Sequence, residues 1–187
     1  MLVVGDSVAS GGGDEAGGWP ERLAERLALS PRAVRIDART ARTMVHVRDH
    51  LDDMLETAGE RPLVLVHVGH NDPQDADDGP RVDPAAFAAA AETVDRALAG
   101  DPAVVAHAVV APVPLVALER PDAVPVSEAA AERNRRYEER LRRAVAPYVA
   151  LGGTPATWAE RTADGVHPNS AGHAAIADRV AAWIGER

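Results

Sequence analysis

Short apolar runs alternate with amphipathic stretches along the chain, and this alternation limits the folds that it can adopt. Apolar, mostly β-branched runs indicate buried strands at 2–4, 34–36, 63–68, 104–110 and 148–151. Between them, the segments 20–29, 44–57, 84–100, 127–145 and 170–184 have helical spacing or helix-capping residues. Strands separated by helices pair in parallel through right-handed crossovers. The pattern therefore predicts an α/β fold, a three-layer α/β/α sandwich around a parallel sheet of about five strands.

The length and apolar content suit one globular domain. The chain has 187 residues, of which 46% are hydrophobic, which is enough to bury a sizeable core. The longest apolar runs fall far short of the roughly 18 to 20 residues that span a bilayer, and no basic-then-apolar leader precedes the first motif. We therefore expect a single domain over 1–187, without membrane insertion, in the cytoplasm.

Two missing residue types exclude several chemistries. Cysteine is absent, and all 20 residues of the Lys+Arg total are arginines. A thiol nucleophile, a Schiff-base lysine and a phosphate-binding Walker lysine are therefore excluded. The formal net charge of −9 argues against nucleic acid as a partner, because phosphate binding is driven by basic patches.

Polar residues follow the predicted strands where a parallel sheet gathers its ligands. Ser7 comes after the first strand in Gly-Asp-Ser, and Asn71 follows the third strand in Gly-His-Asn-Asp. Near the other end, Asp164 and His167 stand three residues apart before the last helix. Open parallel sheets bind ligands outside the carboxyl ends of their strands, so we expect these four residues to converge.

These residue types are the parts of a base-activated nucleophile. A serine hydroxyl attacks a carbonyl when a histidine takes its proton, and a carboxylate holds that ring in place. This pattern assigns the roles of nucleophile, base and orienting acid to Ser7, His167 and Asp164. The oxyanion that forms needs hydrogen-bond donors, which the Ser7 N–H and the Asn71 amide can supply.

The ordered motifs Gly-Asp-Ser, Gly-x-Asn-Asp and Asp-x-x-His-Pro resemble those of the SGNH (GDSL-like) hydrolase superfamily over essentially the whole chain. The resemblance implies a flavodoxin-like fold, no cofactor, and the same three catalytic residues. It also implies esterase, lipase, thioesterase, deacetylase or acyltransferase activity on a small-molecule ester.

One position departs from that family pattern. The family has a glycine after its second strand whose backbone N–H completes the oxyanion hole, whereas this chain has no glycine between residues 37 and 43. Ala41 is the best match, and Arg42 is the alternative donor. An alanine can supply the N–H, although a positive φ there would cost about 1 kcal/mol or more.

Other residues near the expected site have more than one interpretation. Arg39 and Arg42 follow the second strand, where one of them could contact an acidic part of the substrate, or both could pair with surface acids. His70 is expected to shape the site rather than react. The proline-rich segment 112–125 is either a loop or lid beside the site or a plain connection.

Two ligand-binding interpretations are weaker. Asp72, Asp75, Asp77 and Asp78 lack the bidentate glutamate of a calcium loop, so no metal is expected. The glycines at 11–13 fit a dinucleotide fingerprint poorly, because the next two residues are acidic.

We therefore expect a serine esterase that acts through an acyl-enzyme on a small or polar ester. Two alternatives stay open: an acyltransferase with the same machinery, and a catalytically impaired binding module of the same fold. Neither the acyl and alcohol groups nor the oligomeric state can be read from the sequence.

Overall fold

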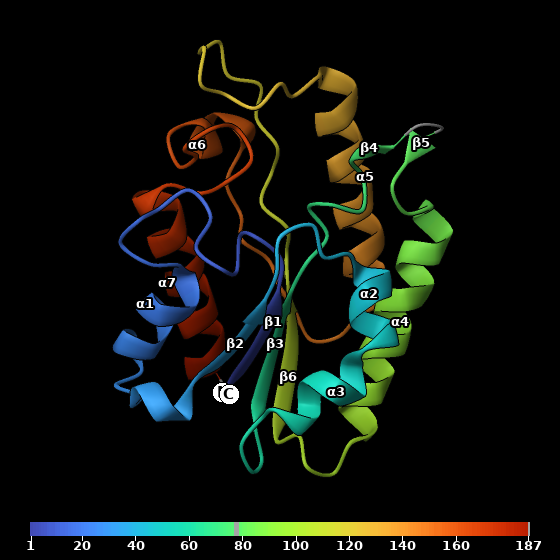
Figure 1. The fold of residues 1–187 in the computed structure, drawn as a ribbon, viewed down its shortest axis with the longest axis vertical. Coiled ribbons are helices and arrows are strands. Elements are labelled where there is room, and N and C mark those ends of the chain that lie inside the picture. The colour runs from blue at the N-terminus through green and yellow to red at the C-terminus, as the bar shows by residue number, and fades with distance from the viewer. Residues whose placement is uncertain (77–78, 187) are drawn as a thin grey trace.

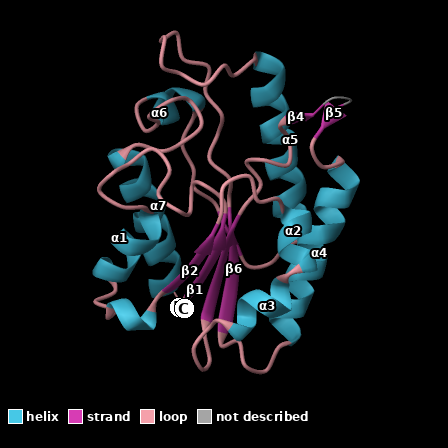
Figure 2. Ribbon diagram, in the orientation of Figure 1, coloured by secondary structure: helices cyan, strands magenta, loops and turns pink. Residues whose placement is uncertain are grey.

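The computed structural model describes residues 1–76 and 79–186. Within these residues five strands form one parallel sheet in the order β2-β1-β3-β6-β7. Figures 1 and 2 show the central part of this sheet between two layers of helices. Along the chain they are β1 (Leu2–Gly5), β2 (Arg35–Ala38), β3 (Leu63–His67), β6 (Ala106–Val110) and β7 (Tyr148–Val149). This is the order of flavodoxin-like α/β folds, so the predicted architecture is confirmed.

Helices cover both faces of the sheet (Figure 1). On one face α1 (Trp19–Arg26) packs against α7 (Ser170–Gly185). The other face carries four helices: α2 (Met44–Asp49), α3 (Leu51–Glu56), α4 (Pro84–Gly100) and α5 (Glu128–Ala144). A short 3-10 helix (Pro31–Ala33) precedes β2, and α6 (Pro155–Ala159) lies beyond the carboxyl ends of the strands.

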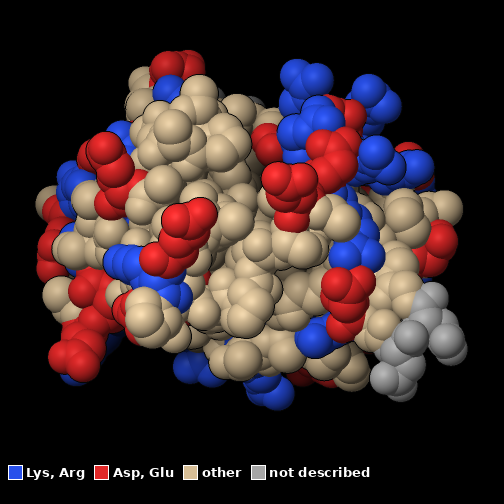
Figure 3. Space-filling model, turned by 90° about the horizontal axis from the view of Figure 1, so that it is seen from above, with Lys and Arg blue, Asp and Glu red and all other residues tan. Residues whose placement is uncertain are grey.

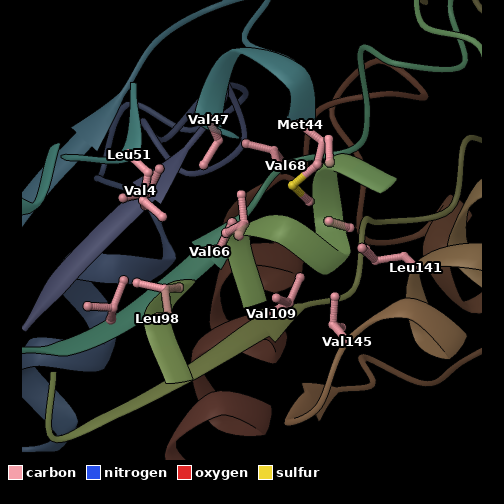
Figure 4. Packing of buried hydrophobic residues seen from close by; sticks show 14 of the residues in the cluster. Val4, Met44, Val47, Leu51, Val66, Val68, Leu98, Val109, Leu141 and Val145 are labelled. Carbon is pink, nitrogen blue, oxygen red and sulfur yellow. The ribbon is translucent and has the colours of Figure 1, made fainter. Parts of the chain in front are cut away.

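The core is divided between the two sides of the sheet. Leu2 and Val4 of β1 belong to the cluster under α2–α5, which Figure 4 shows, and Val3 between them belongs to the cluster under α1 and α7. Alternate residues of a strand point to opposite faces. An apolar run such as that of β1 is therefore required in a strand that is covered on both sides.

The structure differs from the expected elements in three places. The single helix expected at 44–57 is interrupted at His50, whose φ of −126° is not helical, and α3 begins there with Asp52 and Asp53 in its first turn. Helix α1 ends early, because Ala28 adopts a left-handed conformation with a φ of 51°. A hairpin of β4 (Asp75–Ala76) and β5 (Gly79–Pro80) and the short α6 were not expected.

The register of the sheet brings distant segments to one edge. Gly5, the last residue of β1, pairs with Ala38 of β2 and with His67 of β3. The loops that follow these three strands therefore emerge at the same edge of the sheet. The chain places β2 on one side of β1 and β3 on the other, so the strand order changes direction at β1. Ligands of open α/β sheets bind at this switch point.

A buried carboxylate joins two of these loops. Asp72, which follows β3, accepts the Met44 N–H at the start of α2, with N···Oδ1 3.0 Å and N···Oδ2 3.3 Å. Burial raises the pKa of Asp72 to about 7, and the hydrogen bond from Met44 only partly opposes this shift. The charge of Asp6 raises it further.

We predict that the Asp72 carboxyl makes folding stability fall as the pH rises from about 5 to 8. Its pKa is about 7 in the folded chain and 3.8 in an ordinary environment, so between these values the native state keeps a proton that the unfolded state releases. Over this range the loss is at most about 3 kcal/mol, because the pH rises through about two units before it reaches the folded pKa. Asp72→Asn keeps an oxygen for the Met44 N–H but cannot ionise, so its stability should fall less. Urea unfolding of both proteins at pH 5 and pH 8 tests this, and equal pH slopes would contradict it.

Candidate active site

The nucleophile candidate stands on a turn directly after β1. Asp6 closes this turn: its Oδ1 accepts the Val8 N–H at 3.0 Å, and its backbone carbonyl accepts the Ser10 N–H at 3.1 Å. The Ser7 side chain is half-buried, whereas Asp6 is completely buried. The chain thus turns sharply out of a buried strand and leaves the Ser7 hydroxyl at the sheet edge.

A second turn, before α7, carries the candidate base and acid. Asp164 Oδ1 accepts the backbone N–H groups of Val166 at 2.9 Å and His167 at 2.7 Å, and its Oδ2 lies 2.8 Å from His167 Nδ1. On the other side of the ring, His167 Nε2 lies 3.1 Å from Ser7 Oγ. The structure thus connects Asp164, His167 and Ser7 in one chain of hydrogen bonds.

The environment of Asp164 keeps its carboxyl ionised. Burial by itself would raise the pKa of Asp164, but the hydrogen bonds from His167 and Val166 outweigh it and hold the pKa below its ordinary value. A charged carboxylate accepts a hydrogen from Nδ1. This fixes the tautomer of His167 in which Nε2 faces the hydroxyl as an acceptor.

Gly12 and Gly13 lie against His167, and Gly11 lies against Gly18. A Cβ on Gly12 would come within 2.8 Å of the Ser7 carbonyl oxygen and 2.9 Å of His167 Cδ2. A Cβ on Gly13 would meet the Pro168 carbonyl oxygen at 2.4 Å. His173 Nε2 donates to the Gly12 carbonyl at 3.1 Å, while its Nδ1 accepts the Trp19 N–H at 3.2 Å. The close packing explains this glycine run without any nucleotide.

Two backbone N–H groups near the hydroxyl have no protein acceptor. Within the described part of the chain, neither the Ser7 N–H nor the Ala41 N–H makes a hydrogen bond. Ala41 has a φ of 65°, the left-handed conformation that a glycine adopts without strain. The loop therefore has the positive φ considered in the sequence analysis, which costs an alanine about 1 kcal/mol or more relative to glycine.

The Asn71 side chain, the third candidate donor, is fixed by hydrogen bonds to other residues. Asn71 Nδ2 donates to the Arg42 carbonyl at 3.1 Å and to Asp6 Oδ2 at 3.3 Å. His70 binds the same Asp6 oxygen through Nδ1 at 2.8 Å, and its Nε2 accepts the Val113 N–H at 2.8 Å. Both nitrogens of His70 are thus occupied, so this residue lines the site without a free nitrogen for proton transfer.

A cavity of about 490 Å³ opens above these groups. Figure 3 looks onto this end of the molecule, where uncharged residues cover much of the centre and arginines gather to one side. The cavity is lined by Ser7, Thr40, Ala41, His70, Asn71, Pro73, Gln74, Asp75, Arg81, Leu115, Val124, Pro125, Val126, Ala130, Val166 and His167. Most of the residues expected at the site therefore share one space.

The segment 112–125 forms one wall of this cavity. Its backbone is joined to the turn that carries the acid, because the Val116 N–H donates to the Gly165 carbonyl at 2.9 Å and the Val124 N–H to the Asp164 carbonyl at 2.8 Å. The proline-rich segment therefore lies beside the site and is fixed to it, and the alternative of a plain connection is wrong.

Arg42, which the sequence analysis considered as a substrate-binding residue, does not face the cavity. Its side chain is only 4% exposed and does not line the cavity. The guanidinium instead donates to the carbonyl of Asp37, to Asp37 Oδ1 at 2.8 Å and to the Gly5 carbonyl at 3.3 Å. Arg39 is also outside the cavity, with its Nε 3.9 Å from the same carboxylate. Arg42 is therefore a buried structural residue that joins the ends of β1 and β2.

The acidic cluster divides among separate environments. Asp72 is buried against α2, Asp75 pairs with Arg133 at 2.7 Å, and Asp77 and Asp78 lie outside the described residues. No group of three or more potential metal ligands occurs within residues 1–76 and 79–186. The sequence analysis did not identify Gln74 and Arg81 as cavity residues, because neither belongs to a motif.

We predict that Gly12→Ala lowers turnover without abolishing folding. The added Cβ would push the Ser7 backbone and the His167 ring apart, and a misplacement on the order of 1 Å costs about 100-fold in rate. The measurement is kcat for 4-nitrophenyl acetate, with the melting temperature recorded for each protein. Gly59→Ala is the matched control, because no atom lies within 4 Å of its new Cβ. Equal kcat values in the two variants would contradict the prediction.

Comparisons with known proteins agree with this geometry. The model of the GDSL-like Lipase/Acylhydrolase family matches residues 3–175. No curated protein matches the chain. None of the helices in the described residues is long and apolar enough to cross a membrane.

Several solved structures have the same fold at low sequence identity. A catalytic mutant of the acetylxylan esterase Axe2 from Geobacillus stearothermophilus has a TM-score of 0.73 and 17% identity, covering 98% of this chain and 93% of that one. The carbohydrate acetylesterase Est24 from Sinorhizobium meliloti has a TM-score of 0.71 and 17% identity, with 99% and 97% covered. The aryl esterase of M. smegmatis has a TM-score of 0.70 and 19% identity, also with 99% and 97% covered.

The family match spans most of the chain and includes the three motifs that carry the site residues. The chain therefore belongs to the GDSL-like lipase/acylhydrolase family and is a carboxylic ester hydrolase.

Proposed function

We propose that Ser7, His167 and Asp164 are the catalytic triad and that the enzyme hydrolyses a small or polar ester through an acyl-enzyme. The observation that carries this proposal is the uninterrupted path from Asp164 Oδ2 to His167 Nδ1 at 2.8 Å and from His167 Nε2 to Ser7 Oγ at 3.1 Å. Both distances are within hydrogen-bond reach, as a nucleophile and its base require.

In the first step Ser7 Oγ bonds to the ester carbonyl carbon while its proton moves to His167 Nε2. The imidazolium that forms is stabilised by the carboxylate of Asp164, whose low pKa keeps it charged. Collapse of the tetrahedral intermediate breaks the bond to the alcohol. The alcohol leaves with the proton from Nε2, and the acyl group stays on Ser7.

The negative oxygen of the intermediate would be held by the N–H groups of Ser7 and Ala41, which have no acceptor among the described residues. Asn71 Nδ2 adds a third donor when it exchanges its long 3.3 Å contact with Asp6 for the substrate oxygen. The two backbone N–H groups are fixed before the reaction, and a donor of this kind stabilises such an oxygen without reorganisation, each worth about 2.7 to 4 kcal/mol of the barrier.

Deacylation repeats the same steps with water. His167 takes a proton from the water that attacks the acyl carbon, and the proton then returns to Ser7 Oγ as the carboxylic acid leaves. The residues that line the cavity supply no other nucleophile with a base at hydrogen-bond distance, within the described part of the chain.

The cavity favours a small ester with a polar portion. Part of its lining is apolar and comes from Leu115, Val124, Pro125, Val126, Ala130 and Val166. Thr40, Gln74, Asp75 and Arg81 add polar groups to the same lining. Two of the similar structures are of an acetylxylan esterase and a carbohydrate acetylesterase, so acetyl esters of sugars are the first natural-type substrates to test.

We predict that Ser7→Ala removes turnover of every ester in a panel of 4-nitrophenyl esters and acetylated sugars. Without the hydroxyl no acyl-enzyme can form. Ser10→Ala is the matched control, because Ser10 lies in the same turn but only donates to the Ser7 carbonyl at 2.9 Å. Turnover of any of these esters by Ser7→Ala at the wild-type rate would refute the proposal.

Asn71→Ala should lower kcat about 100- to 1000-fold, which is the usual cost of losing one oxyanion donor.

A further inference from the structure

Two charged side chains other than histidine line the catalytic cavity. Asp75 and Arg81 come from the two sides of the β4–β5 hairpin, in which Asp75 pairs with Pro80. The Arg81 N–H also donates to the Gln74 carbonyl at 2.7 Å, so the pairing continues by one residue toward the site. This part of the cavity lining therefore carries one negatively charged and one positively charged side chain.

Asp75 has an ionic partner, whereas Arg81 has none among the described residues. Asp75 Oδ1 lies 2.7 Å from Arg133 Nη2 of α5, which compensates its charge. The Arg81 guanidinium has a single long contact, from Nη2 to Gln74 Oε1 at 3.4 Å. Among the residues that the structure describes, Arg81 forms no ion pair with a carboxylate. Within residues 1–76 and 79–186, Arg81 is thus a cation without an ion-pair partner, and it lines the cavity that contains Ser7.

The other arginines near this edge are engaged elsewhere. Arg42 and Arg39 both lie against Asp37, at 2.8 Å and 3.9 Å, and neither lines the cavity. The net charge of −9 disfavours the approach of an anion to the protein. The Arg81 guanidinium supplies a positive group in the cavity lining that can attract one.

We propose that Arg81 binds a carboxylate on the alcohol portion of the substrate, so that the enzyme prefers acyl esters of acidic alcohols over neutral ones. This inference rests on the proposed ester hydrolysis and adds a substrate class to it. The alcohol portion is assigned to the hairpin because Gln74 and Arg81 there are polar members of the lining, while the apolar lining residues suit an acyl chain. A guanidinium matches a carboxylate with two parallel hydrogen bonds.

The experiment compares two esters of equal size, 3-acetoxybenzoate and its neutral counterpart 3-acetoxybenzamide. For the wild type kcat/KM should be higher for the benzoate. Arg81→Gln should lower kcat/KM for the benzoate about fivefold, the scale of one solvent-exposed ion pair, and leave the benzamide unchanged. Arg81→Lys should retain part of the preference, because it keeps the charge but not the bidentate geometry.

Arg39→Gln is the matched control, because it removes the same charge from the same edge at a side chain that is 75% exposed and outside the cavity. Arg39→Gln should leave kcat/KM unchanged for both esters. High salt should reduce the wild-type preference, since about 1 M salt screens exposed charges beyond roughly 3 Å.

Three results overturn the inference: an equal effect of Arg81→Gln on both esters, no effect on either, or the same loss in Arg39→Gln. These results leave ester hydrolysis itself intact as long as the benzamide is turned over and Ser7→Ala is inactive. If the wild type hydrolyses neither ester nor any ester of the panel, the proposed function fails as well.

Discussion

The hydrogen bond between Ser7 Oγ and His167 Nε2 joins two positions 160 residues apart in the sequence, and the arrangement of the site depends on it. One end is fixed by the turn after β1, which the buried carboxylate of Asp6 closes. The other end is fixed by Asp164, whose two oxygens hold both the backbone and the ring of His167. Between them Gly12 and Gly13 allow the two backbones to approach more closely than a side chain would permit.

A buried polar network fixes Asn71, one of the proposed oxyanion donors, in a similar way. Asp6 accepts from His70 and Asn71, and although its burial would raise its pKa, the attraction and hydrogen bond of His70 hold that pKa below the ordinary value. Next to it, burial lowers the pKa of His67 to about 3, so this ring is neutral, and its Nε2 donates to the Ala111 carbonyl at 3.0 Å. A charged carboxylate surrounded by donors is a stable support, because each of its partners satisfies part of the charge that burial penalises.

Much of the fold, and which residues meet at the candidate site, could be predicted from the sequence. The apolar runs predicted the strands, and a parallel sheet brings residues that follow its strands to one edge, which is why Ser7, Asn71 and Ala41 could be placed together. The side-chain direction of Arg42 could not be predicted. An arginine after β2 can face the cavity or turn back under the loop, and the carboxylate of Asp37 and two backbone carbonyls decide this only in the folded chain. Arg81 was missed for the related reason that a two-residue strand pairing gives no periodic signal, so the hairpin that places it in the cavity was not visible.

The most direct test of the proposed triad is covalent labelling with a fluorophosphonate, followed by peptide mapping. The reagent reacts with a serine whose hydroxyl is activated by a base, so one label per chain should form and map to the peptide that contains Ser7. Labelling should slow sharply in His167→Ala, in which the hydroxyl remains but its base is lost. A label on another residue, or equal labelling rates in the wild type and His167→Ala, would contradict the account.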